Sequence, residues 1–195
     1  SKTVKPEDMH CVVAGAGFIG LEMVEQLHRK GMNVTLVEMQ TQILAPLDEE
    51  MAAILHRDLV EHGVDVIPGD ALQDFALYDI DPDASVLTLK SGRKLPPAHL
   101  TILGLGVKPD TLVVKEAGIA CTPRGHIIVD DHLHTSAPNV WAVGDAVEVK
   151  NPIIPGERWA VPLAGPANRQ GRMVADNIFG KQCLFKGTYG VSIVR

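Results

Sequence analysis

The chain has 195 residues and 46% of them are hydrophobic, which is enough for one large domain or two small ones with buried cores. The net charge is −6 and no block of Lys or Arg stands out, which argues against nucleic acid and anionic membranes as partners. Apolar stretches break well before membrane-spanning length, and three widely separated cysteines argue against a disulfide framework, so we expect a cytoplasmic protein. The first residues carry neither a signal core nor an initiator Met, and we expect a chain cut from a longer one.

The first forty residues predict a βαβ unit. Segment 10–20 is a short apolar run that breaks into glycines, and apolar residues then recur at helical spacing from Phe18 to Leu27. Gly31 is a plausible end for this helix, and residues 33–38 read as a second strand. Strand, glycine turn, helix and strand within about thirty residues are typical of this unit.

A second helix and a change to shorter strands follow. Asp48 is a candidate N-cap, and the inner face of the helix is expected to consist of Met51, Ile54, Leu55 and Leu59. Residues 64–68 read as a third strand. Residues 70–95 predict antiparallel strands with a turn at Ser91–Gly92, and residues 100–106 predict an apolar strand running into glycines.

The pattern differs after Gly106. We expect a loop and a short helix at 108–119, strands at 125–130 and 139–145, and a helix from about Pro166 to Phe179. The tail 185–195 begins as another strand. The fold class expected is α/β: a Rossmann-like domain with βαβ units and an antiparallel β-meander, then a second part of different character.

Gly15, Gly17 and Gly20 form a G-x-G-x-x-G motif between a strand and a helix. In that context Gly15 permits the tight turn, Gly17 lets the backbone approach a pyrophosphate, and Gly20 lets the helix pack on the strand. The helix N-terminus adds N–H donors and a positive dipole. The alternative is a glycine-rich turn in an ordinary α/β core.

Glu38 ends the second strand, near the spacing expected for the acid that binds the adenosine ribose. Its carboxylate would repel the 2′-phosphate of NADP by roughly 4 kcal/mol per unit charge at about 4 Å. The residue therefore predicts a preference for NAD(H) over NADP(H). The alternative is a solvated Glu at a strand end.

Five segments together resemble the FAD-dependent pyridine nucleotide-disulfide oxidoreductases, and the resemblance covers nearly the whole chain. They are residues 12–27, 41–51, 104–111, 135–149 and 162–180. The branch that is most similar contains coenzyme A-disulfide reductases, NADH oxidases, NADH peroxidases and polysulfide reductases. Residues 162–172 and 187–192 carry most of the resemblance to this branch.

The resemblance implies three parts in this chain. Residues 1–106 match the NAD(H)-binding domain, residues 107–180 the second, C-terminal part of the FAD-binding domain, and residues 181–195 the start of a dimerisation domain. The first FAD part and its redox cysteine are expected outside the chain. None of Cys11, Cys121 and Cys183 matches that cysteine, so no catalytic residue is expected here.

Cofactor contacts are implied at specific positions. Ten positions match the NAD(H) site of the family: the glycine turn Gly15, Gly17, Phe18, Ile19 and Gly20, together with Glu22, Glu38, Gly104, Leu105 and Gly106. Gly144, Asp145, Ala146, Pro162, Leu163 and Ala164 match positions around FAD. Asn168 stands where some relatives carry a substrate-side His, which places a proton-donating role there in doubt. From the residues alone, two interpretations of Asp145 are equally supported: a side chain that caps a loop or helix, and a side chain that binds a ligand.

The resemblance implies a homodimeric flavoenzyme that passes hydride from NADH to FAD and on to a disulfide, polysulfide, peroxide or O₂. This chain alone is expected to bind NADH without turnover. One alternative is a stand-alone NAD(H) sensor, and another is a reductase of a ferredoxin- or rubredoxin-like protein. A metal site in segment 126–134 is disfavoured because no further ligands occur at metal-site spacing.

Overall fold

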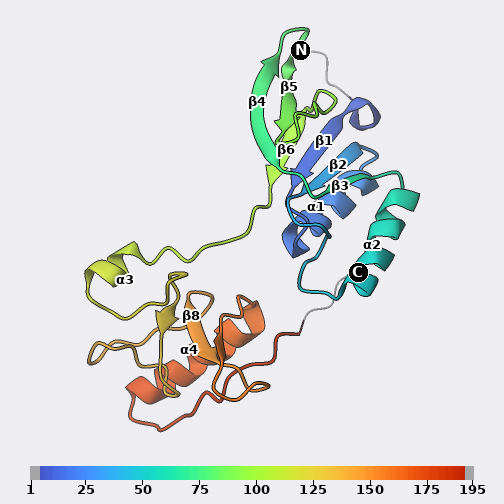
Figure 1. Ribbon diagram of the computed structural model, residues 1–195. Coiled ribbons are helices and arrows are strands. Elements are labelled where there is room, and N and C mark those ends of the chain that lie inside the picture. The colour runs from blue at the N-terminus through green and yellow to red at the C-terminus, as the bar shows by residue number, and fades with distance from the viewer. Residues whose placement is uncertain (1–4, 192–195) are drawn as a thin grey trace. The chain divides into compact units, whose positions relative to one another are not determined.

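The computed structural model describes residues 5–191 of the chain. The chain divides into two compact units, one ending at Gly106 and one beginning at Val107. In Figure 1 the first unit runs from blue to yellow-green and the second from yellow to red. Each unit has its own sheet and its own hydrophobic core.

The first unit contains a four-stranded parallel sheet in the order β3-β2-β1-β6. Its elements are the 3₁₀ turn η1 (Pro6–Asp8), β1 (His10–Ala14), α1 (Phe18–Arg29), β2 (Asn33–Glu38), α2 (Glu49–Glu61), β3 (Asp65–Pro68), β4 (Leu72–Tyr78), β5 (Asp81–Leu89) and β6 (Leu100–Leu103). The predicted α/β class with βαβ units is confirmed.

The parallel sheet is covered on both faces, which gives the first unit three layers (Figure 1). Cys11 and Val13 of β1 pack with Val24 and other residues of α1, together with part of α2. Val12, which points to the opposite face, packs with residues of β5 and the segment after it. Because β1 is buried on both sides, its sequence is a continuous apolar run rather than an alternating one.

The inner face of α2 differs from the sequence prediction. Met51 and Ile54 are exposed, whereas Ala52 is buried and Leu55 and Leu59 pack against the core. Residues 52, 55 and 59 also follow helical spacing, so the pattern alone allowed two adjacent faces. Asp48 is the N-cap residue as expected, although its side chain makes no capping hydrogen bond.

The antiparallel part of the first unit is built around β5. One edge of β5 pairs with β4, and its other edge makes isolated bridges from Ser85 to Ala98 and from Thr88 to Lys94. The predicted turn at Ser91–Gly92 joins β5 to this third arm, and Gly92 has a φ of 86°. β4, β5 and the segment after the turn follow the antiparallel order of the expected meander, but that last segment pairs with β5 only through isolated bridges.

The second unit contains less helix and strand than the first unit. Its elements are α3 (Leu112–Glu116), β7 (Ile127–Ile128), β8 (Val147–Lys150), β9 (Arg158–Trp159) and α4 (Ala164–Ile178). β8 pairs with β7 in parallel and with β9 antiparallel. The predicted helices at 108–119 and 166–179 are confirmed, and the expected strand at 125–130 is reduced to two residues.

Two expected strands of the second unit are absent from the described residues. Segment 139–145 pairs only through an isolated bridge from Trp141 to His134, so it forms no strand. A strand needs a ladder of backbone partners, and an apolar run does not supply them by itself. The tail up to Val191 is also irregular, and residues 192–195 lie outside the described part.

The tail is nevertheless packed onto the second unit. Phe185 is 3% exposed and lies in the core cluster with Leu133 and Val147. Its backbone N–H donates to the carbonyl of Asp131 at 2.7 Å. The Asn177 side chain of α4 also accepts from the backbone N–H of Cys183 at 2.7 Å. Phe185 is therefore part of this unit's core, and Cys183 is hydrogen-bonded to α4.

Candidate functional site

The ends of three parallel strands bring most of the first predicted site together. The glycine turn follows β1, Glu38 is the last residue of β2, and Gly104–Gly106 follow β6. The backbone N–H of Gly15 donates to the carbonyl of Val37, and that of Gly104 donates to the carbonyl of Ala14. Ligands of open α/β sheets bind at this carboxyl edge.

Gly15 and Gly20 are required by close backbone packing. Gly15 has a φ of 99°, and a Cβ atom there would collide with the carbonyl of Gly104. A Cβ atom on Gly20 would collide with the carbonyl of Gly15. These two glycines therefore shape the turn and hold α1 against it, as the sequence predicted.

Gly17 differs from its two neighbours in the motif. No atom lies within 4 Å of a Cβ built on it, and its φ of −77° is open to any residue. The protein itself does not need a glycine there. Gly17 is the N-cap of α1, so the missing side chain leaves open space where the helix dipole and free N–H groups are directed.

The N-terminus of α1 has the donors that an anion needs. In the described part of the chain, the N–H groups of Phe18, Ile19 and Gly20 make no hydrogen bond. α1 has twelve residues, enough for a helix dipole to contribute at its first turn. Space, donors and dipole together fit the pyrophosphate of a dinucleotide.

The Glu38 carboxylate is bound to the glycine turn. Its Oε2 accepts from the backbone N–H of Ala16 at 2.6 Å, and its Oε1 accepts from that of Gln40 at 2.8 Å. The carbonyl of Ala16 in turn accepts from the N–H of Leu44 at 2.8 Å. Leu44 is buried and has a φ of 47°, which costs energy for a residue with a side chain.

The remaining residues of the first predicted site are exposed around this turn. Phe18, Ile19 and Leu105 carry exposed apolar side chains, and Glu22 and Gly106 are also exposed. In the described residues no hydrogen bond or ion pair holds the Glu22 side chain. The first predicted site is thus one contiguous group at the sheet edge.

The second predicted site lies within the second unit and is organised by α4. The backbone N–H of Gly144, which has a φ of 85°, donates to Oε1 of Gln170 at 2.7 Å. Asp145 is exposed, and no described residue donates to its carboxylate. Leu163 is the N-cap of α4 and Ala164 its first residue, with Pro162 exposed just before. The expected FAD positions therefore meet through one helix.

Segment 126–134 makes an internal polar network centred on Asp130. Asp130 accepts from the backbone N–H groups of His132 and His134, and it pairs with the His134 ring at 3.4 Å. Burial raises the pKa of Asp130, but these hydrogen bonds and the charge of the His134 ring together hold that pKa below its usual value. Among residues 5–191 no group of three or more His, Cys, Asp or Glu side chains is arranged to hold a metal ion.

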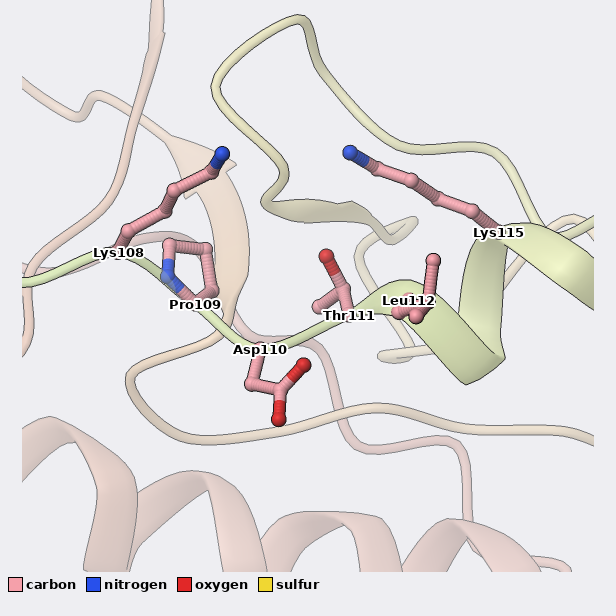
Figure 2. Close-up of a pocket in the computed structure, with 6 residues that line it drawn as sticks. All are labelled: Lys108, Pro109, Asp110, Thr111, Leu112 and Lys115. Atoms are coloured by element: carbon pink, nitrogen blue, oxygen red, sulfur yellow. The ribbon is translucent and has the colours of Figure 1, made fainter.

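An open pocket of about 340 Å³ lies beside α3 in the second unit. Figure 2 shows the ammonium groups of Lys108 and Lys115 on the same side as the Thr111 hydroxyl, with the Asp110 carboxylate directed away. The Thr111 hydroxyl is buried and already donates to the carbonyl of Gly125 at 2.6 Å. The lysines are exposed, and none of the residues predicted from the sequence lines this pocket.

Two further observations concern the reactivity of the cysteine thiols and the length and apolar composition of the helices. All three cysteines are free, and burial raises the pKa of the Cys11 thiol, which makes it a poor nucleophile. Within the described helices, none has the length and apolar composition required to span a bilayer.

A comparison with known protein families gives a match over residues 2–171 to the family described as pyridine nucleotide-disulphide oxidoreductase. The chain belongs to this family. The resemblance drawn from the motifs is thereby confirmed. Members of the pyridine nucleotide-disulphide oxidoreductase family are oxidoreductases that depend on FAD and NAD(P)H.

Two curated relatives show the extent of the likeness. The NADH oxidase of Enterococcus faecalis is 33% identical over 183 residues, which are 93% of this chain and 40% of that protein. The NAD(P)H coenzyme A polysulfide/persulfide reductase of Pyrococcus horikoshii is 32% identical over 185 residues, covering 94% and 40%. The chain thus spans about 40% of the length of these relatives.

Solved structures of the family share the fold. Reduced CoADR-RHD of Bacillus anthracis is 43% identical with a TM-score of 0.85, covering 95% of this chain and 32% of that one. The NAD-dependent persulfide reductase from A. fulgidus is 33% identical with a TM-score of 0.87, covering 96% and 34%.

Three residues near the two groups were not predicted from the sequence: Ala16 and Leu44 at the glycine turn, and Gln170 on α4. The first two act through their backbone, for which side-chain identity gives no signal. Gln170 is buried on α4, but its partner Gly144 lies 26 residues away in sequence, so no local signal marks the bond between them.

Proposed function

We propose that this chain is the NAD(H)-binding domain and the second FAD-binding part of a flavoprotein oxidoreductase. In this proposal residues 1–106 bind NAD(H), residues 107–180 complete an FAD domain whose first part lies elsewhere, and residues 181–195 begin a dimerisation domain. The observation that carries it is the geometry around Gly17, where open space, free N–H groups and a nearby carboxylate meet.

The glycine turn binds the dinucleotide through its backbone. The pyrophosphate lies against Gly17 and accepts from the free N–H groups of Phe18 and Ile19. Glu38 accepts hydrogen bonds from the ribose hydroxyls with lone pairs that Ala16 and Gln40 leave unused, since each carboxylate oxygen accepts more than one bond. The residues therefore fit the cofactor in both charge and space.

The same carboxylate determines the preference between the two nicotinamide cofactors. Glu38 is fixed in place by two backbone N–H groups, so it does not turn away from an added 2′-phosphate. We expect NADH to bind more tightly than NADPH because the fixed negative charge opposes the phosphate. Expressed as a binding constant, each 1.4 kcal/mol of this repulsion is a factor of about ten.

On the nicotinamide side, the residues available are Glu22 on α1 and Gly104–Gly106 after β6. The exposed glycine segment lets the ring approach the backbone, and Glu22 provides an acceptor for its carboxamide. Bound FAD supplies the chemistry of hydride acceptance and onward electron transfer. The chain's own residues hold the two cofactors in position.

The substrate and assembly are proposed at a coarser level. Named relatives include an NADH oxidase, a persulfide reductase and, in Staphylococcus haemolyticus, a coenzyme A disulfide reductase. We infer an acceptor of the disulfide, polysulfide, peroxide or O₂ class for a cytoplasmic, homodimeric parent enzyme. The redox cysteine is expected in the part outside this chain, because none of Cys11, Cys121 and Cys183 matches the family's redox-cysteine motif.

The test is an anaerobic titration of the full-length parent protein. We expect purified parent to contain FAD, and NADH to bleach the visible flavin absorption more efficiently than NADPH. The 195-residue chain is the matched sample, and it should bind NADH without retaining stoichiometric FAD. A colourless parent that binds NADH would overturn the proposal of a flavoenzyme and favour an NAD(H) sensor. The finding that the natural protein consists of these 195 residues alone would have the same effect.

A further inference from the structure

We propose that Gln170 is a positioning residue for the FAD site: its side-chain oxygen holds the Gly144–Asp145 turn in the shape that receives the cofactor. This inference rests on the proposed function, because it concerns the FAD half of the site. It assigns a role to a residue that makes no direct cofactor contact in the proposal.

Gln170 is a buried polar side chain with a specific partner. It is 3% exposed, although glutamine side chains are mostly found at the surface. Its Oε1 accepts the backbone N–H of Gly144 at 2.7 Å across 26 residues of sequence. Gln170 lies in the interior of α4, whose own backbone hydrogen bonds do not require a polar side chain at this position.

The residues of α4 that face the Gly144 turn allow it to approach the helix closely enough for the Gln170 hydrogen bond. Ala167 and Gln170 are three residues apart and lie on the same side of the helix. The Cβ of Ala167 is 3.9 Å from the position of a Cβ on Gly144, so the small residue lets the turn approach the helix. Gly144 has a φ of 85°, a conformation that glycine adopts without a steric cost.

Fixing the Gly144 N–H determines which donors remain for a ligand. In the described part of the chain, the N–H groups of Asp145 and Ala146 make no hydrogen bond. The carbonyl of Ala146 is already bound to the N–H of Ile127 in the sheet. Gln170 on one side and Ile127 on the other therefore hold the backbone of the turn, and with it the N–H groups of Asp145 and Ala146, in place.

α4 also connects the two segments expected around FAD. Pro162, Leu163 and Ala164 lead into the helix, and Gln170 contacts Gly144 almost two turns later. The loop before α4 and the Gly144–Asp145 turn are consequently held at a defined separation by one rigid element. Loss of the Gln170 bond should loosen the turn without moving the loop.

The experiment compares variants of the full-length parent protein by titrating its apoprotein with FAD. Gln170→Met keeps the length of the side chain but removes the acceptor and leaves the partly buried N–H of Gly144 unpaired. We expect about 10- to 100-fold weaker FAD binding, the range for such a loss. Gln170→Glu keeps an oxygen at the same place, so its FAD affinity should lie closer to the wild-type value. Gln26→Met, on the exposed side of α1, is the control and should bind FAD as the wild type does.

Two readouts separate positioning from general damage to the fold. NADH affinity should be unchanged in Gln170→Met. The fraction of FAD affinity that Gln170→Glu restores, relative to Gln170→Met, should exceed the fraction of thermal stability that it restores. The inference is overturned if Gln170→Met binds FAD like the wild type, or if the Met and Glu variants are equally weak. If wild-type parent binds no FAD at all, the proposed function fails as well, which is a different outcome from failure of the Gln170 inference alone.

Discussion

Glu38 Oε2 and the backbone N–H of Ala16 are joined by a hydrogen bond of 2.6 Å, which connects the end of β2 to the middle of the glycine turn. The residue expected to recognise the ribose therefore also braces the turn that receives the pyrophosphate. Recognition of the sugar and shape of the turn depend on the same carboxylate. A change at Glu38 must affect both.

Glu38→Ala is expected to weaken NADH binding about 10- to 100-fold, because hydrogen bonds to a charged group contribute about 1.5–3 kcal/mol each. Calorimetric titration of the chain with NADH and NADPH measures the change. The preference for NADH should shrink, because NADH loses its ribose hydrogen bonds, whereas for NADPH the relief of charge repulsion is offset by loss of the brace on the glycine turn. Glu61→Ala, which removes only an exposed ion pair with Arg57, is the control. NADPH binding by Glu38→Ala as tight as NADH binding by the wild type would contradict the bracing role.

The motif glycines should divide into two classes when each is replaced by Ala. Gly20→Ala is expected to destabilise the first unit by about 1–3 kcal/mol or more, because its Cβ would overlap the carbonyl of Gly15. Gly17→Ala should change stability by less than about 1 kcal/mol, since its Cβ enters open space. Urea denaturation of each variant measures the difference. Equal stability of the two variants would show that the close approach of Gly15 and Gly20 is wrong.

Asp70 should make the first unit sensitive to acid. The hydroxyl of Ser91 and the backbone N–H groups of Ala71 and Ser91 hold the pKa of Asp70 below its usual value. A lowered folded-state pKa contributes stability above the unfolded value of about 3.9, and this stability is lost as pH falls through the folded-state pKa. Unfolding measured between neutral pH and about pH 3 should show a steeper loss for wild type than for Asp70→Asn. Asp79→Asn in the exposed β4–β5 turn is the control, and parallel curves for all three proteins would refute the role of Asp70.

Phe185 should be essential to the second unit even though it lies after the last helix. Phe185→Ala is expected to cost about 3–5 kcal/mol because the side chain is buried in the core cluster. Phe179→Ala is the matched control, since Phe179 is 88% exposed and its removal should change stability by less than about 0.5 kcal/mol. Thermal unfolding distinguishes them. A similar, small effect of both changes would mean that the tail is not part of the core.

The features that the sequence predicts correctly are those whose structural requirement is local. The strand–turn–helix order and the glycine spacing predicted the turn, because Gly15 and Gly20 meet within one loop and the first turn of α1. The parallel sheet followed from the same pattern. The positions of Glu38 and Gly104 at the sheet edge then follow from the strands that end there.

Features that depend on distant partners were not predicted from the sequence. Segment 139–145 has the composition of a strand, but only Trp141 has a bridge partner among the described residues. Met51 and Ile54 have the spacing of an inner face, but packing selects Ala52 instead. The bond from Gly144 to Gln170 spans 26 residues and has no local signature.

The most direct test of the central claim is a calorimetric titration of the 195-residue chain and its Gly17→Val variant with NADH. Val at position 17 should leave the fold intact and fill the space reserved for the pyrophosphate. Gly171→Val in α4, which also has no atom within 4 Å of its Cβ, controls for the substitution itself. We expect saturable binding of one NADH to wild type and to Gly171→Val, and none to Gly17→Val. Undiminished binding by a folded Gly17→Val variant, or no binding by wild type, would contradict the claim.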